Sequence, residues 1–82
     1  MIATYIQKAL QKAHYELIDD PNPYYGEVLG LDGVWANGVT LEQCRENLAQ
    51  ALEDWLFFSI AKGLPIPPMD GVELNVPSEV AV

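Results

Sequence analysis

The sequence predicts an α+β fold with one antiparallel sheet and helices packed against it. Residues 1–13 carry apolar side chains at helical spacing, three short alternating stretches follow, and a long capped helical pattern covers residues 40–62. The predicted order is an N-terminal helix, a three-stranded antiparallel meander, a long helix and a final strand. With 82 residues the chain has room for one domain, divided into the helix, a core of residues 14–76 and a tail of residues 77–82.

The first half of the chain accounts for the N-terminal helix and the meander. Helical spacing is shown by Ile2, Ile6, Ala9, Leu10 and Ala13. The stretches "HYELID", "YYGEVLG" and "VWAN" then alternate apolar and polar residues as strands do. Pro21 and Pro23 lie between the first two stretches and cannot donate to a sheet, so a turn is expected there.

The long helix has signals at both ends. Thr40 and Gln43 have the spacing of a capping box, in which the Thr40 hydroxyl accepts from the Gln43 amide and the Gln43 side chain returns to the Thr40 amide. Gly63 is a natural end. Steps of 100° predict an inner face and a solvent-facing acidic stripe. The inner face contains Cys44, Leu48, Ala51, Leu52, Trp55 and Ser59, and the stripe contains Glu42, Glu46 and Glu53. We expect Trp35 to pack beneath this helix, and "GVELNV" near the C-terminus to form the final strand.

The charge balance indicates the kind of partner. Four basic and 12 acidic residues give a net charge of −8, which disfavours direct binding to nucleic acid or to an anionic membrane and favours a basic protein. No segment approaches the roughly 20 apolar residues that cross a membrane. A single cysteine and the absence of a signal peptide fit a cytoplasmic protein.

Few residues suggest catalysis. Cys44 and His14 are the only cysteine and histidine, so no zinc-ligand cluster exists, and Cys44 is expected to be buried. A magnesium-dependent nuclease would need Glu16, Glu27 and a helix carboxylate to converge. The alternation around both glutamates instead predicts the wet face of a sheet. We therefore expect no enzyme activity and no cofactor.

The C-terminal half of the long helix predicts self-association. "WLFFSIA" is apolar nearly all round, and a helix of this kind must be covered on both sides. We predict a homo-oligomer, either a dimer or a tetramer, with Tyr5 or Ile6 of the first helix as additional contacts. The interface is predicted to contain Leu56, Phe57, Phe58 and Ile60.

The run "YYGEVLGLDGVWANGVTLEQCRENLAQALEDWL", followed by "GLPIP", resembles the HicB-like antitoxin family. The resemblance covers residues 13–76, although the turn "LGLDG" lacks the usual prolines and Cys44 stands where alanine is frequent. The matching residues are Tyr25, Leu31, Gly33, Gly38, Thr40, Leu41, Glu42, Leu48, Ala51, Leu52, Trp55, Gly63, Ile66 and Pro67.

The resemblance implies a degenerate ribonuclease H-like core without catalytic acids, in which the final strand lies beside the first. It also implies that the partner is a HicA-like toxin, a small basic ribonuclease that cleaves mRNA. Members often carry a C-terminal DNA-binding domain, and a small stand-alone member is expected here. An orphan oligomeric interaction module is the alternative. The predicted toxin-binding acidic residues are Asp19, Asp20, Glu27, Glu42, Glu46 and Glu53.

Overall fold

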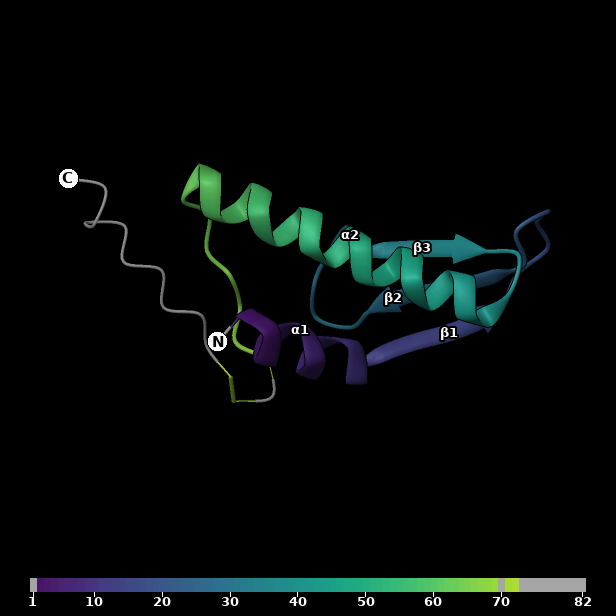
Figure 1. Ribbon diagram of the computed structural model, residues 1–82, viewed down its shortest axis with the longest axis horizontal. Coiled ribbons are helices and arrows are strands. Elements are labelled where there is room, and N and C mark those ends of the chain that lie inside the picture. The colour runs from purple at the N-terminus through teal and green to yellow at the C-terminus, as the bar shows by residue number, and fades with distance from the viewer. Residues whose placement is uncertain (1, 70, 73–82) are drawn as a thin grey trace.

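The computed structural model describes residues 2–69, 71 and 72, and it confirms the predicted α+β fold. A short helix is followed by an antiparallel sheet and a long helix that crosses the sheet (Figure 1). The elements are α1 (Ile2–Gln11), β1 (Ala13–Leu17), β2 (Tyr24–Val28), β3 (Trp35–Gly38) and α2 (Leu41–Lys62).

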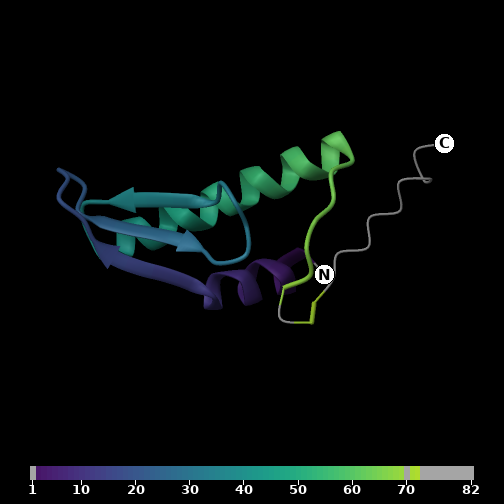
Figure 2. The same ribbon diagram turned by 180° about the vertical axis from the view of Figure 1, so that it is seen from behind.

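The three strands form a meander in the order β1-β2-β3. His14 lies opposite Glu27 and Glu16 opposite Tyr25 in the first hairpin, and Glu27 lies opposite Trp35 in the second. Side chains alternate between the two faces of a sheet, so these residues share one face. Seen from behind, the three strands have no helix in front of them (Figure 2), because α2 packs on the other face.

Helix α2 begins and ends with local signals that the sequence displays. The Gln43 amide donates to Thr40 Oγ1 at 3.0 Å, as expected for an N-cap. The Gln43 side chain accepts from the Val39 amide at 2.8 Å, one residue before the expected Thr40. At the other end Gly63 adopts a left-handed conformation with φ 68°, and its amide donates to Ile60.

The core lies between the sheet and the two helices. Cys44, Leu48, Leu52 and Ser59 of the predicted inner face are buried, and Ala51 and Trp55 are half-buried. Helix α1 contributes the fully buried Tyr5, whose phenol donates to the carbonyl oxygen of Pro67. The main buried cluster contains Tyr5, Ala9, Val28, Leu31, Val34, Ala36, Leu48, Leu52, Leu56 and Met69.

The expected place of Trp35 under α2 is wrong. Ala36 and Gly38 face the helix instead, so Trp35 points to the opposite side of the sheet. A Cβ atom at Gly38 would lie 2.6 Å from the Cys44 backbone nitrogen. The helix therefore approaches β3 too closely for any larger residue at this position, and no indole could fit between them.

The predicted final strand is described only at its start. Val72 forms an isolated antiparallel bridge with Met69, and the two residues exchange backbone hydrogen bonds of 2.8 and 2.9 Å. Residues 73–76, the rest of this predicted strand, and the predicted tail of residues 77–82 lie outside the described residues.

Candidate protein-interaction surface

The sheet face that α2 does not cover carries six side chains from three strands. Register places His14 and Glu16 of β1 beside Glu27 and Tyr25 of β2, and the latter two lie beside Trp35 and Asn37 of β3. We call this surface the open face. Its central feature is a large aromatic side chain, Trp35, which is 53% exposed. Large exposed aromatic groups are typical anchors of protein interfaces.

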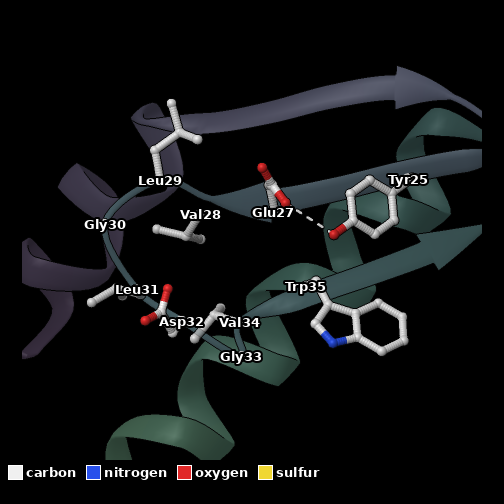
Figure 3. A pocket seen from close by; sticks show the side chains of 10 residues that line it. All are labelled: Tyr25, Glu27, Val28, Leu29, Gly30, Leu31, Asp32, Gly33, Val34 and Trp35. Atoms are coloured by element: carbon white, nitrogen blue, oxygen red, sulfur yellow. Dashed lines mark hydrogen bonds between the residues drawn. The ribbon is translucent and has the colours of Figure 1, made fainter.

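Trp35 is supported by its neighbour on β2. The Tyr25 and Trp35 rings stack with centroids 6.1 Å apart and planes inclined by 27°. The Tyr25 hydroxyl donates to Glu27 Oε1 at 3.0 Å, and this bond is the main reason that the pKa of Tyr25 is raised (Figure 3). The stack and the hydrogen bond fix the positions of two aromatic rings and one carboxylate before any partner binds.

A pocket of about 290 Å³ adjoins this stack (Figure 3). The β2–β3 connection forms its rim, and its lining includes Trp35, Tyr25, Glu27 and Asp32. Glu27 and Asp32 bring carboxylates to a site that also has an aromatic wall. Lysine and arginine side chains bind such combinations, because an aromatic face attracts a cation and a carboxylate pairs with it.

The surrounding chain contributes negative charge without compensating positive side chains. Residues 13–38, which form the whole sheet and its connections, contain no lysine and no arginine. The same segment contains Glu16, Asp19, Asp20, Glu27 and Asp32. The open face and its rim are therefore suited to a basic protein surface, and the charge would also speed the encounter with it.

Comparisons with known proteins identify the family. Residues 4–67 match the sequence model of a family described as UPF0150-like. The chain belongs to the UPF0150-like family. The UPF0150-like protein is also similar to TTHA0281 from Thermus thermophilus, whose crystal structure superposes with a TM-score of 0.89 at 46% identity and covers 93% of this chain and 94% of that chain. A comparison with curated proteins finds no match. None of the described helices could span a bilayer.

The predicted acidic surface is divided between two sides of this UPF0150-like protein. Glu27 lies on the open face, and Asp19 and Asp20 lie in the connection between β1 and β2. The stripe formed by Glu42, Glu46 and Glu53 is exposed as expected, but it lies on α2, on the other side of the sheet, where Glu42 and Glu46 line a groove that also includes Leu10 of α1. The six carboxylates therefore do not form one continuous surface. From the sequence, Glu27 was included in this surface, Trp35 was placed under α2 instead, and Asp32 was not included.

The carboxylates that a nuclease would need do not converge. Glu16 and Glu27 lie on the open face, whereas the carboxylates of α2 lie beyond the opposite face. Among residues 2–69, 71 and 72 no group of three potential metal-ligating side chains is found. Cys44 and His14 are likewise separated by the sheet. Cys44 is buried under α2, where its Sγ donates to the Ala36 carbonyl at 3.7 Å and burial raises the pKa of the thiol.

A second exposed apolar surface lies near the end of α2. Phe57 is 62% exposed and Phe58 is 56% exposed, whereas Ile60 is half-buried. Lys62 Nζ lies 5.8 Å from the centroid of the Phe58 ring. Two residues expected at an oligomer contact are not exposed: Leu56 is 2% exposed and belongs to the core, and Tyr5 is fully buried. Phe57 and Phe58 thus form the available surface, and we call it the Phe57–Phe58 face.

Proposed function

We propose that this UPF0150-like protein is a HicB-like antitoxin domain, which binds and neutralises a small basic mRNA-cleaving toxin. The proposed action is non-catalytic: the domain covers the toxin's RNA-binding surface. Two observations support this proposal: the run of residues that resembles the HicB-like family, and the net charge of −8. A cytoplasmic location accords with an mRNA-cleaving partner.

The observation that carries the proposal is the open face. Trp35 and Tyr25 form a stacked, partly exposed pair beside Glu27 and Asp32, in a segment without lysine or arginine. An RNA-binding protein surface is rich in lysine and arginine, since it must bind phosphate. The same side chains that bind RNA would be engaged by the open face, so toxin binding and RNA binding would exclude each other.

Co-expression with the small basic protein from the adjacent reading frame tests the proposal. We expect the two proteins to co-purify, and raising the salt concentration should weaken the complex. The toxin's cleavage of mRNA should stop at one equivalent of the UPF0150-like protein. Failure of any neighbouring small basic protein to bind at low salt would contradict the antitoxin function.

Two substitutions with a matched control test the surface. Trp35→Ala should raise the Kd of the complex by about 30-fold, the effect of losing an interface anchor worth about 2 kcal/mol. Glu27→Lys should also weaken binding, because it places a cation where the partner is basic. Glu53→Lys makes the same charge change on the outer side of α2 and should have a smaller effect. Equal losses from the two lysine variants would show that only net charge matters.

A second candidate function is favoured by the Phe57–Phe58 face. Its two exposed aromatic side chains fit an oligomeric interaction module that acts without a toxin. Such a module would self-associate and would show no binding to the neighbouring basic protein. The binding experiment above therefore distinguishes the two candidates.

A further inference from the structure

The outer edge of β1 has backbone groups that no described residue engages. The Ile18 amide donates to the Pro23 carbonyl at 2.8 Å, which marks a hydrogen-bonded pair at the end of the β1–β2 ladder. Hydrogen-bonded and non-hydrogen-bonded residue pairs alternate along an antiparallel ladder. The backbone N–H and C=O groups of His14 and Glu16 therefore also point to β2. Those of Ala13, Tyr15 and Leu17 consequently point away from the sheet.

The other edge of the sheet is partly closed. The Val28 amide donates to the Val34 carbonyl at 3.1 Å, so alternation turns the backbone groups of residues 35, 37 and 39 outward. Asn47 Nδ2 donates to the Asn37 carbonyl at 2.9 Å, and the Val39 amide donates to the Gln43 side chain at 2.8 Å. Side chains of α2 thus occupy part of the β3 edge.

The β1 edge is also apolar on the side that faces the helices. Leu17 points to this side and is 70% exposed. The reason is that α2 packs mainly over β3 and β2 and leaves β1 less covered. An added strand would bury the Leu17 side chain and satisfy the outward backbone groups together.

We propose that this edge binds β1 of a second copy of the chain, in an antiparallel register centred on Tyr15. Three registers pair the outward backbone groups of the two β1 strands near their middle. They place the two-fold axis at His14, at Tyr15 or at Glu16. Centring on Tyr15 pairs all five strand residues, with Ala13 opposite Leu17 and His14 opposite Glu16. Centring on Glu16 would put two carboxylates opposite each other, and centring on His14 would leave Leu17 unpaired.

Residues 73–82 of the same chain are the rival occupant. The second copy is favoured because the register makes β1 complementary to itself. Each His14 lies opposite a Glu16 of the other copy, so this pair occurs twice, and each exposed Leu17 lies opposite an Ala13. The two-fold axis runs perpendicular to the sheet, so the contact closes as a dimer with a six-stranded sheet. Both open faces then lie on the same side of the dimer.

Cross-linking of mixed variants tests both the contact and the register. His14→Cys and Glu16→Cys are made in separate full-length chains, each also carrying Cys44→Ala. Opposite residues of a non-hydrogen-bonded pair have Cα atoms about 4.5 Å apart, within the range of a disulfide. We expect a disulfide-linked dimer on a non-reducing gel when the two variants are mixed and oxidised, and little from either variant alone.

Every other pattern overturns the proposal. Cross-linking of His14→Cys alone would indicate the register centred on His14, and cross-linking of Glu16→Cys alone the register centred on Glu16. No cross-link in the mixture would mean that this edge is free or is covered by residues 73–82. Phe57→Ala added to both chains should leave the cross-link in place, because the Phe57–Phe58 face takes no part in it.

Sedimentation of Leu17→Pro provides a second measurement. Proline removes an amide that points away from β2, so the internal ladder keeps its hydrogen bonds while the edge loses one. We expect dimerisation to weaken at least 10-fold with the circular dichroism spectrum unchanged.

Raising the salt concentration should strengthen the wild-type dimer, because salt screens the repulsion between two chains that each carry a charge of −8. This salt response is opposite to the one expected for a toxin complex. For the proline variant, a dimer of Leu17→Pro as stable as that of the wild type would contradict the edge contact.

Discussion

Tyr5 of α1 donates a hydrogen bond to the carbonyl oxygen of Pro67, across 62 positions in the chain. The Tyr5 side chain is fully buried, and burial raises the pKa of its phenol. Pro67 lies in the segment that follows α2, so this bond joins the first helix to the last described segment. The short helix α1 is thereby held in place by more than its apolar stripe.

The substitution Tyr5→Phe should lower the free energy of unfolding by about 1 kcal/mol, the usual net value of one hydrogen bond. Urea denaturation followed by circular dichroism measures this change. Tyr24→Phe is the matched control, since the Tyr24 hydroxyl makes no hydrogen bond within the part of the chain that the structure describes. Equal effects of the two substitutions would show that the Pro67 contact contributes nothing to stability.

Gly38→Ala should destabilise the fold by about 1–3 kcal/mol, the cost typical of an overpacked core. The new Cβ would lie 2.6 Å from the Cys44 backbone nitrogen, and the start of α2 would have to move away from β3. Thermal unfolding measures the loss. Asn37→Ala on the adjacent, open side of β3 serves as the control and should change stability by no more than about 0.5 kcal/mol. A tolerated Gly38→Ala would mean that α2 shifts freely.

Local signals in the sequence predicted local structure well. The N-cap at Thr40 and the end at Gly63 were predictable because each depends on residues within one helical turn. The face of Trp35 was not predictable in this way. Strand β3 has only four residues, and the side on which Trp35 lies is decided by the approach of Cys44 to Gly38, a tertiary contact.

The candidate site shows the same limit. The sequence gives the number of acidic residues, but the packing of α2 decides which side of the molecule each one occupies. Glu27 and Glu53 therefore lie on different sides although both were predicted to bind the same partner. The run around Leu56 is apolar nearly all round, so helical periodicity does not decide which of its residues is buried. Leu56 is buried in a cluster that includes Tyr5 and Ala9 of α1 and Met69 of the segment after α2, which are tertiary contacts. The alternation of Trp35 with the small residues Ala36 and Gly38 shows only that Trp35 lies on the face opposite to theirs; the packing of α2 on Ala36 and Gly38 decides that this face is the open one.

The hydrogen bond from Tyr25 to Glu27 predicts a pH dependence. The protonated phenol is the donor, so the pKa of Tyr25 is raised in the folded state. Its stabilising contribution is complete below the unfolded value of about 10 and is lost as pH rises through the higher folded pKa. Ultraviolet absorbance of tyrosinate, compared with that of Tyr25→Phe, isolates this titration.

Substitution of the acceptor should move the Tyr25 titration to lower pH. Glu27→Gln replaces the carboxylate acceptor by a neutral amide oxygen, which weakens the hydrogen bond that is the largest cause of the raised pKa and also removes the Glu27 charge. Glu16→Gln is the control, because Glu16 acts on Tyr25 only through its charge and is the last of the four causes. A larger change from Glu16→Gln than from Glu27→Gln would contradict the hydrogen bond as the main cause.

Phe57→Ala should reduce the size of the homo-oligomer. Phe57 is 62% exposed near the end of α2, and truncating a buried interface aromatic should cost association about 2–4 kcal/mol. Light scattering at high micromolar concentration measures the assembly, and Leu29→Ala changes an exposed residue away from α2 as the control. If the β1 edge forms a dimer and the Phe57–Phe58 face joins two such dimers, Phe57→Ala converts a tetramer to a dimer. A monomeric wild type would refute self-association, and an unchanged oligomer in Phe57→Ala would refute the role of Phe57.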